Sequence, residues 1–504
     1  MQKYKTILIL ILLFAISIVI RFQNIDRPLS EHHEWITAHT LITLQIWNDD
    51  GISKFNYNPV FTYHNKGDQF QSDLGRLPDA ENNYYYVSYP PFAFLFPYFT
   101  FQVFNISPTV VSLQIFNILL HFIACLFVYR IISLVYNFND KGKIFYPAMV
   151  GTLFYMFMPT TLWYHTNIYF VDILVQTIWI IGIFILLKII IHKQHSVKWI
   201  IGLGVVNFFM IYTEWIGIFF SLLTCLICLV KLRSQKVYTK ILLSIIVSTV
   251  AAILLIAMQY STICGFECLM NELTSKYLYR SGTSNLTDRN LSLFNFQSYK
   301  EIFTSYVWEF SPYFLMMLVL FLITTTLIYR KSIKKLLNQS ELLLIILCIV
   351  PVQLHHFIFF NFTSIHSFST FKTSLFFSIL LSVIYYKLLD QKKLFLNIGI
   401  GITLVFCIVH YYKINNRDYI DPKYETVGTE IRKAAKPDEV VIVTGTDAEY
   451  LICPQLHFYA KRNVTFCDNM EEVKSFLVKF NQQKAVVFQM TPDREIIDIQ
   501  RITI

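Results

Sequence analysis

The sequence predicts an α-helical polytopic membrane protein of about eleven transmembrane helices, followed by a small C-terminal α/β soluble domain. Three observations support this fold class. The 504 residues are 55% hydrophobic and only 15% charged, with a mean hydropathy of +0.49, whereas soluble globular chains carry about 25% charged residues. Apolar runs of membrane-spanning length recur along the chain. Residues 420–504 instead alternate short β-branched runs with helical stretches.

Eleven apolar runs approach the about 17 to 25 residues that cross a bilayer as a helix. They lie at 5–20, 110–135, 144–159, 170–190, 199–213, 215–230, 240–260, 308–329, 341–361, 369–387 and 394–412. The first run follows Lys3 and Lys5 and is followed by Arg21-Phe22-Gln23-Asn24, which is no small-residue cleavage site. We therefore expect a retained signal-anchor helix.

Charge determines the expected topology, because basic residues concentrate in cytoplasmic loops. The pattern holds if 199–230 is a hairpin turning at Glu214 and 92–105 lies on the outer surface. The inner loops then contain only Asp140 and Asp390 as acids beside these basic residues: Lys3, Lys5, Arg130, Lys141, Lys143, Lys188, Lys193, Lys198, Lys231, Arg233, Lys236, Lys240, Arg330, Lys331, Lys334, Lys335, Lys387, Lys392 and Lys393. This predicts a multi-pass protein of the plasma (inner) membrane with a cytoplasmic N-terminus and an extracytoplasmic C-terminus.

The long loops, at 21–109 and 261–307, and everything after residue 412 then lie outside. We expect a transmembrane domain at 1–412, with its functional loop at 21–109, and a small extracytoplasmic α/β domain at 413–504. The net charge of +9 resides in short loops, so it reports topology and gives no reason to expect a nucleic-acid partner.

Within the C-terminal domain, β-branched runs predict strands at Val440–Thr444, Val464–Phe466 and Ala485–Phe488. Helices are expected at 450–461 and 471–480. Two cysteine pairs fall in segments predicted to be outside, where a disulfide is permitted. They are Cys264 with Cys268, and Cys453 with Cys467, and spacing alone does not decide either pairing.

The densest group of ionisable residues follows the first helix, in Ser30-Glu31-His32-His33-Glu34-Trp35. Ser30 precedes a helical run and resembles an N-cap, which would place Glu34 at a helix start. A solvated first turn would explain the carboxylates through the helix dipole. Their position at the lip of a membrane span also suits a general base held near a partly dry cavity. We therefore treat Glu31, His32, His33 and Glu34 as candidate site residues.

Asp172 lies at the outer mouth of an otherwise apolar helix, so it is a second candidate, although an interfacial cap is the alternative. Glu214 could be a turn residue or a cavity residue. Cations at the outer headgroup level could hold a phosphate-bearing lipid, namely Arg76, Lys276, Arg280, Arg289 and Lys372. A snorkelling lysine is the alternative for Lys372. A divalent metal held by histidine and carboxylate is a further option, but no ligand set is defined.

These residues resemble the bacterial membrane glycosyltransferases of the C fold (GT-C), relatives of protein O-mannosyltransferases and aminoarabinose transferases. That family shows an Arg ending the first helix, a Pro-Leu pair, an Asp-Glu in the first outer loop, a Tyr-Pro-Pro, an Asp at the fourth span and a Tyr-Tyr-Ala-x-Arg near the C-terminus. The matching residues here are Arg21, Pro28-Leu29, His33-Glu34, Tyr89-Pro90-Pro91, Asp172 and Phe458-Tyr459-Ala460-Lys461-Arg462. The main departure is His33, where the family has Asp.

The resemblance implies transfer of a sugar from a polyprenyl-phosphate-linked donor to a lipid, glycan or protein acceptor at the outer face, with inversion. Glu34 would be the base, with His33, Asp172 and Glu31 beside it. Lys372, Arg76, Arg280, Arg289, Tyr89 and His32 would bind substrate. A lipid or sugar transporter or flippase is the main alternative, but it would show internal repeats and polar residues at the bilayer midplane. A non-catalytic assembly factor would leave replacement of Glu34 silent.

Overall fold

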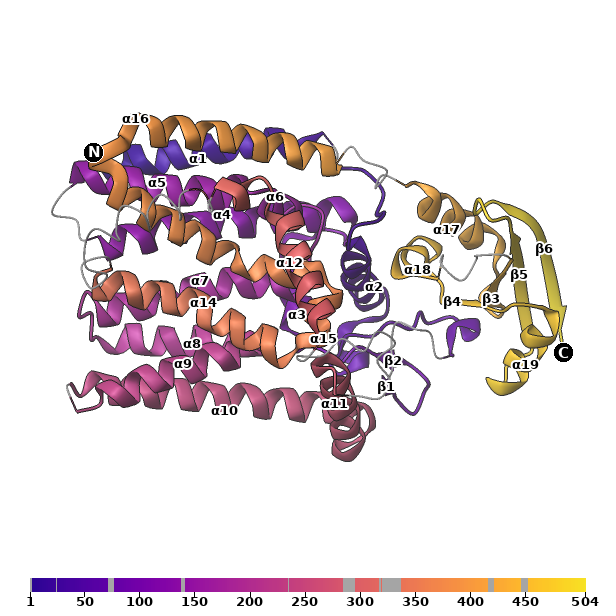
Figure 1. The fold of residues 1–504 in the computed structure, drawn as a ribbon. Helices are drawn as coiled ribbons and strands as arrows, with labels where there is room; N and C mark the ends of the chain where they lie inside the picture. The colour runs from indigo at the N-terminus through magenta and orange to yellow at the C-terminus, as the bar shows by residue number, and fades with distance from the viewer. Residues whose placement is uncertain are drawn as a thin grey trace.

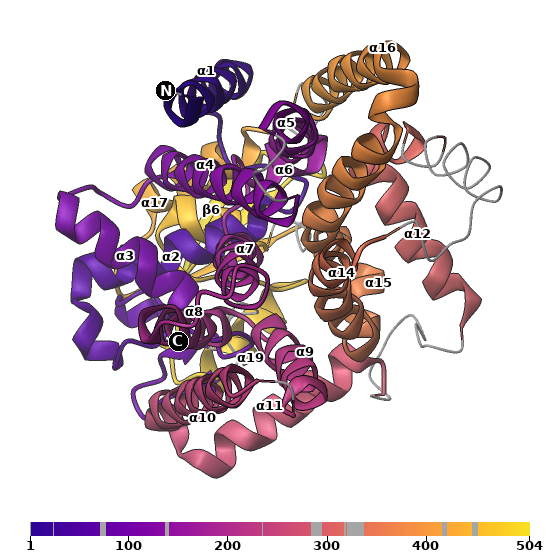
Figure 2. The same ribbon diagram turned by 90° about the vertical axis from the view of Figure 1, so that its left-hand side faces the viewer.

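The computed structural model describes residues 2–23, 25–70, 77–136, 141–233, 235–283, 295–316, 319, 337–415, 421–445 and 452–504. Its long helices are α1 (Gln2–Phe22), α4 (Val110–Val135), α5 (Lys141–Phe157), α7 (Val171–Ile190), α8 (Val197–Thr213), α9 (Ile216–Lys231), α10 (Val237–Cys264), α14 (Gln339–Ile358) and α16 (Ser374–Asn415). These helices form a bundle, with α7 near its centre between α4 and α8 (Figure 2).

Shorter elements connect the bundle helices. They are α2 (Glu34–Asp50), η1 (Ile52–Phe55), η2 (Lys66–Asp68), β1 (Leu77–Pro78), β2 (Tyr84–Tyr85), α3 (Phe92–Phe104), α6 (Pro159–Tyr164), α11 (Phe266–Ser281), α12 (Phe296–Phe310), α15 (Phe360–Ile365) and η4 (Ser367–Thr373). Among them, α2, α11, β1 and β2 lie at one end of the bundle, beside the C-terminal sheet and opposite the N-terminus (Figure 1). The predicted segregation of the long loops to one end is visible in this arrangement.

Seven helices of the described chain are long and apolar enough to cross a membrane. They are Tyr4–Phe22, Val110–Val135, Val171–Ile190, Val237–Cys264, Gln339–Ile358, Ser367–Leu388 and Leu394–Lys413, and each matches a predicted span. The predicted spans at 144–159, 199–213 and 215–230 form shorter apolar helices. Most of the predicted span at 308–329 lies outside the described residues. At 13 residues, α3 is about 20 Å long, too short for the about 30 Å of a bilayer core.

Helix α16 contains the last two spans in one unbroken assignment of 42 residues. The hydroxyl of Tyr385 donates to Asn397 Oδ1 at 2.8 Å, although the two residues are 12 positions apart. In a straight helix that separation is about 18 Å, which these side chains cannot bridge. The helix therefore bends sharply between the two spans, and Figure 1 shows the ribbon turning back there. Two separate spans were predicted here, at 369–387 and 394–412, and the chain reverses between them.

The C-terminal region holds a four-stranded sheet in the order β4-β3-β5-β6. Its elements are α17 (Lys423–Ala434), β3 (Val440–Thr444), α18 (Pro454–Ala460), β4 (Val464–Phe466), α19 (Met470–Lys479), β5 (Lys484–Met490) and β6 (Ile496–Thr503). Strand β3 runs parallel to β4 and β5, whereas β6 is an antiparallel edge strand. The three predicted strands are confirmed, and β6 is an addition that the sequence analysis did not contain.

The two faces of β3 pack against different layers. Val441 and Val443 face the cluster formed with α17 and α18, whereas Val440 and Ile442 face the cluster formed with α19. Cys453 packs against the first cluster and Cys467 belongs to the second. The two cysteines are free because the sheet separates them, so the pairing that spacing permitted is wrong.

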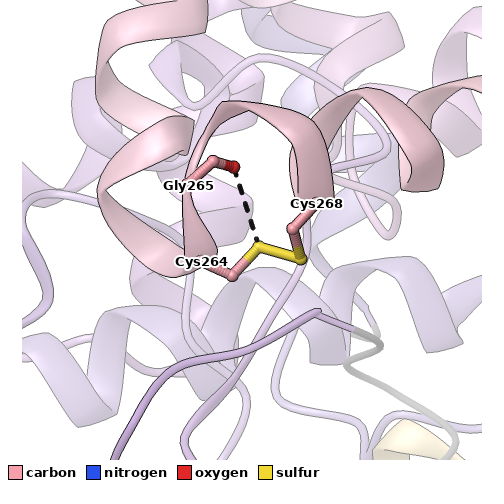
Figure 3. The surroundings of a disulfide bond; sticks show 3 residues. All are labelled: Cys264, Gly265 and Cys268. Atoms are coloured by element: carbon pink, nitrogen blue, oxygen red, sulfur yellow. Dashed lines mark hydrogen bonds between the residues drawn. A yellow bond between two sulfur atoms is a disulfide. The ribbon is translucent and has the colours of Figure 1, made fainter.

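Cys264 and Cys268 do form a disulfide (Figure 3). It closes the corner between α10 and α11, where Gly265 has a φ of +88°. This φ lies in a region that favours glycine, and a Cβ at that position would meet no atom within 4 Å. The conformation, rather than lack of space, therefore accounts for glycine at the corner.

Candidate functional site

Two groups of polar and ionisable residues, most of them buried, lie at the end of the bundle that faces the C-terminal sheet. The outer-loop cluster comprises Arg27, Ser30, His33 and Glu34, from the first long loop and the start of α2. The bundle cluster comprises Asp172, Glu214, His355 and Lys372, from α7, the α8–α9 turn, α14 and η4. Buried charges need partners, and the partners in each cluster show what that cluster can do.

In the outer-loop cluster, Glu34 is the first residue of α2 and its side chain is 1% exposed. Its Oε1 accepts from the guanidinium of Arg27, and its Oε2 accepts from the backbone N–H of Ser30 at 2.6 Å. Burial raises the pKa of Glu34 to about 7, while Arg27 and the Ser30 amide act in the opposite direction. Arg27 also lies 5.0 Å from the ring centroid of Trp163. Both carboxylate oxygens are therefore occupied inside the protein.

The backbone just before α2 has an unusual conformation. His32 and His33 have φ values of 53° and 70°, in the left-handed region that few non-glycine residues occupy. His33 is the N-cap of α2 but makes no side-chain cap bond. The expected cap by Ser30 is wrong, because its hydroxyl donates to Pro28 O and its amide binds Glu34. Consecutive left-handed residues at a cluster of ionisable groups are typical of functional sites.

The C-terminal region holds this loop in place. The hydroxyl of Tyr459 accepts from the backbone N–H of Leu29 at 2.7 Å, and Gln455 Nε2 donates to Ser30 O at 2.6 Å. Both residues belong to α18. The exposed carboxylate of Glu31 accepts from the Tyr424 hydroxyl at 3.1 Å. The loop that carries Glu34 is thus bonded to helices more than 390 positions along the chain.

A second connection lies further along the same loop. Asp68 is buried, and both of its carboxylate oxygens accept from Arg462 Nε at 3.0 Å. Arg462 also donates to the backbone oxygens of Lys436 and Glu439. A Cβ at Gly67 would lie 2.1 Å from Glu439 O, so only glycine permits this approach. These contacts fasten the first outer loop to the C-terminal sheet.

In the bundle cluster, the ammonium of Lys372 donates to Asp172 Oδ1 and lies 3.8 Å from Glu214 Oε1. His355 Nε2 lies 2.9 Å from the same Glu214 oxygen. Each side chain is at most 3% exposed. Lys372 is therefore a buried, paired lysine and does not snorkel to the headgroups. Asp172, at the first turn of α7, is a partner of η4 and not an interfacial cap.

Arg280, from α11, lies beside this cluster without a carboxylate within ion-pair distance among the described residues. Its guanidinium carbon lies 4.3 Å from the ring centroid of Tyr89 and 5.0 Å from that of Phe362. It also donates to Ser88 O at 3.1 Å. Because aromatic rings only partly satisfy a guanidinium, Arg280 retains capacity for an anion. Its side chain is half-buried, which leaves it reachable.

Glu309, from α12, connects to the outer-loop cluster through Ser367 of η4 and was missed by the sequence analysis. Its Oε1 accepts from the hydroxyls of Tyr164 and Ser367, at 2.9 and 2.7 Å. The Ser367 oxygen in turn lies 2.9 Å from His33 Nε2. Glu309 is 2% exposed. A lone carboxylate in the aromatic stretch Tyr306-Val307-Trp308-Glu309-Phe310 was the signal that could have revealed it.

The remaining predicted residues are not part of either cluster. Arg76 and Arg289 lie outside the described residues. Lys276 pairs with Glu272 at 3.0 Å on α11. His32 packs its ring 5.0 Å from that of Trp163. In the part of the chain that the structure describes, no three His, Cys, Asp or Glu side chains are grouped to hold a metal ion, so we derive no step through a metal.

An apolar groove of about 240 Å³ opens next to the bundle cluster. Its lining comes from α12, the segment just after it, α14, η4 and α16: Phe303, Tyr306, Phe314, Ile349, Gln353, Thr373, Phe376 and Phe377. Thr373 follows Lys372 directly in the chain. The groove therefore lies beside η4, the element that carries Lys372. Such a combination suits an amphiphile with an apolar tail and an anionic head.

Comparison with solved structures reveals the same architecture elsewhere. ArnT from Cupriavidus metallidurans, solved bound to undecaprenyl phosphate, matches with a TM-score of 0.60 at 13% identity, over 96% of this chain and 93% of that chain. The archaeal oligosaccharyltransferase AglB from Archaeoglobus fulgidus, in complex with an inhibitory peptide and a dolichol-phosphate, matches with a TM-score of 0.54 at 12% identity, over 97% and 70%. This chain has the GT-C glycosyltransferase fold.

No protein-family model and no curated protein matches the sequence. The GT-C fold is thus evident in three dimensions while the sequence has diverged to about one identity in eight. The predicted resemblance and fold class are confirmed by these structural matches. Because a fold can host different activities, the activity has to be argued from the site.

Proposed function

We propose that the protein is a membrane glycosyltransferase that moves a sugar from a polyprenyl-phosphate donor to an acceptor hydroxyl at the outer face. The observation that carries the proposal is the apolar groove beside η4, the element that carries Lys372 of the bundle cluster, within a GT-C fold. A polyprenyl chain would occupy the groove, and its phosphate would lie near Arg280. ArnT was solved bound to undecaprenyl phosphate and AglB with dolichol-phosphate, which supports a donor of this chemical class.

The proposed reaction is a single displacement. A base of the outer-loop cluster removes the proton from the acceptor hydroxyl, and the oxygen attacks the anomeric carbon. The bond from that carbon to the phosphate oxygen breaks, and its electron pair leaves with the phosphate. Attack opposite the leaving group inverts the anomeric configuration, as in other direct sugar displacements. Arg280 stabilises the charge that develops on the phosphate.

Topology and the domain arrangement form part of the same proposal. The N-terminus is cytoplasmic, and residues 413–504 form an extracytoplasmic domain that packs over the first outer loop. This orientation places both charged clusters at the outer leaflet of the plasma membrane, where a lipid-linked donor and an outer-face acceptor can meet. The acceptor class is a lipid, a glycan or a protein.

The test is sugar transfer by membranes that contain the protein, using a panel of radiolabelled polyprenyl-phosphate sugars. Wild type is compared with Glu34→Gln and Asp172→Asn at equal expression. We expect label to move to an acceptor with wild type and transfer to fall in both variants, because each removes a charge from a cluster of the site. Failure of wild type to transfer from any donor would contradict the proposal.

Proteoliposomes that contain the purified protein distinguish the transporter alternative. Labelled donor is placed in one leaflet, and its accessibility to an impermeant reagent is followed without acceptor. A transferase leaves the donor in its leaflet over the assay, whereas a flippase equilibrates it. The polar clusters lie at one end of the bundle, which favours the transferase.

A further inference from the structure

The proposed reaction requires a group that accepts the proton of the acceptor hydroxyl. Glu34 is poorly arranged for this task, because Arg27 occupies one of its oxygens and the Ser30 amide the other. The residue is also 1% exposed. A general base must come within hydrogen-bond reach of the proton that it removes. Glu34 would first have to break its contacts, which anchor the loop to the start of α2.

The neighbouring residue His33 is more accessible than Glu34 and makes fewer hydrogen bonds. Its side chain is half-buried, and only one ring nitrogen has a partner among the described residues, Nε2 with Ser367 Oγ at 2.9 Å. Ser367 uses its single hydroxyl proton to donate to Glu309 Oε1 at 2.7 Å. The Ser367 oxygen must therefore accept from His33, which places the ring proton on Nε2. Nδ1 is then left with an unshared lone pair.

The bonds beyond Ser367 are arranged to keep that tautomer. Glu309 is fixed by a second hydroxyl, that of Tyr164, at 2.9 Å. The chain from His33 through Ser367 to Glu309 thus joins the first outer loop, η4 and α12. Burial lowers the pKa of His33 to about 4, so the ring is neutral near neutral pH. A positive charge formed on the ring would be stabilised through Ser367 toward the Glu309 carboxyl.

We propose that His33 is the proton acceptor of the transfer reaction, and that Ser367 and Glu309 are positioning residues that hold its tautomer. The inference rests on the proposed function. Nδ1 takes the proton from the acceptor hydroxyl as that oxygen bonds to the anomeric carbon and the phosphate departs with the electron pair. The imidazolium then returns the proton to water. Glu34 shapes the loop, through Arg27 and Ser30, and does not take the proton.

The backbone geometry permits a clean test with His33→Gly. Glycine tolerates the φ of 70° at this position, so the substitution removes the ring and preserves the loop. The assay uses the polyprenyl-phosphate sugar that wild type turns over best, with and without free imidazole. We expect transfer by His33→Gly to fall at least about 100-fold, as for loss of a general base. Added imidazole should restore part of the rate.

Asn82→Gly is the matched control, because Asn82 is an exposed residue of the same outer loop with a φ of 62°. Its transfer should equal that of wild type and should not respond to imidazole. Glu34→Gln should lose activity that imidazole cannot restore. Full transfer by His33→Gly, or rescue of Glu34→Gln alone, would overturn the role of His33 while leaving the transferase intact. Only inactivity of wild type would count against the proposed function itself.

The positioning role of Ser367 is tested with Ser367→Ala and Ser367→Thr. Removing the hydroxyl should lower kcat about tenfold and leave the KM for the donor unchanged, since the tautomer is lost without a change in donor contacts. Threonine retains the hydroxyl and should recover most of kcat. A change confined to KM, or an equal loss with threonine, would overturn the assignment.

Discussion

The outer-loop cluster and the bundle cluster each hold a carboxylate in a buried ion pair, but the chain brings the partners together differently. Arg27 and Glu34 are 7 residues apart on one loop, whereas Asp172 and Lys372 are 200 residues apart on two packed elements. The first pair needs only a local turn. The second pair forms only when α7 and η4 pack against each other, so it depends on the fold of the whole bundle.

The two clusters also differ in what surrounds them. Lys372 has two carboxylates within 4 Å, so its charge is compensated within the protein. In the outer-loop cluster, the half-buried His33 ring keeps a nitrogen for which the described residues provide no partner. Among the described residues, Asp172 Oδ2 and His355 Nδ1 of the bundle cluster also have no hydrogen-bond partner, but both atoms are buried. A general base must come within hydrogen-bond reach of an incoming hydroxyl, which the half-buried ring of His33 permits. We infer that the bundle cluster mainly builds the site and that the outer-loop cluster performs the proton transfer.

The largest expected effect comes from breaking the bundle pair with Lys372→Met. This leaves Asp172 and Glu214 buried without their cation, which costs about 3–5 kcal/mol of unfolding free energy. We expect a clear fall in the thermal unfolding midpoint of the detergent-solubilised protein, with loss of transfer. The double variant Lys372→Met/Asp172→Asn should recover part of the midpoint.

The matched change in the other cluster is Arg27→Met. It should lower the midpoint less than Lys372→Met does, because Glu34 keeps its bond to the Ser30 amide and the loop can adjust. Transfer should fall in both variants. Equal midpoints for the two substitutions would show that the clusters do not differ in their coupling to the bundle.

A smaller effect is expected at Arg280, which has no carboxylate within ion-pair distance among the described residues. Arg280→Ala should raise the KM for the lipid-linked donor about 10- to 100-fold, the effect of losing a charge-assisted bond of about 1.5–3 kcal/mol. The unfolding midpoint should not change, because no carboxylate loses a partner. Steady-state transfer at varied donor concentration measures this. Arg280→Lys retains the positive charge but not the bidentate geometry of the guanidinium, so its KM should lie between those of wild type and Arg280→Ala. An unchanged KM for Arg280→Ala would show that Arg280 does not bind the donor.

The sequence was informative wherever a signal is local. A lone charge in an apolar helix identified Asp172 and Lys372 as site candidates, and β-branched runs placed β3, β4 and most of β5. The ion pair between Asp172 and Lys372 could not be predicted, because no local sequence signal relates residues 200 positions apart. The cap expected at Ser30 failed because the loop turns through two left-handed residues, His32 and His33, which no propensity favours.

Other misses have similar physical causes. Strand β6 has an almost fully exposed burial pattern and carries Asp498, Gln500 and Arg501, so neither of its faces is apolar along its whole length. It pairs only as an edge next to β5. The bonds from Tyr459 and Gln455 to the first outer loop span more than 420 positions. Sequence motifs could suggest that both ends of the chain matter, but only the fold shows that they touch.

The smallest expected effect probes that contact between the C-terminal region and the outer-loop cluster. Tyr459→Phe removes the hydroxyl that accepts from the Leu29 amide. Leaving that amide unpaired should lower the free energy of opening the loop by about 1 kcal/mol. We expect transfer to fall about fivefold without a shift in the bundle's unfolding midpoint. The loop between α1 and α2 should exchange its amide hydrogens faster, as measured by hydrogen exchange and mass spectrometry.

How far the faster exchange extends shows whether the outer-loop cluster and the bundle cluster open independently. Lys372 and Asp172 lie on elements that do not contact Tyr459 through any hydrogen bond of the described residues, so peptides of α7 and η4 should exchange as in wild type. Exchange that spreads into α7 would mean that the two clusters open together and form one cooperative unit. Exchange confined to residues 25–34 would establish that the C-terminal region supports only the loop that carries His33 and Glu34.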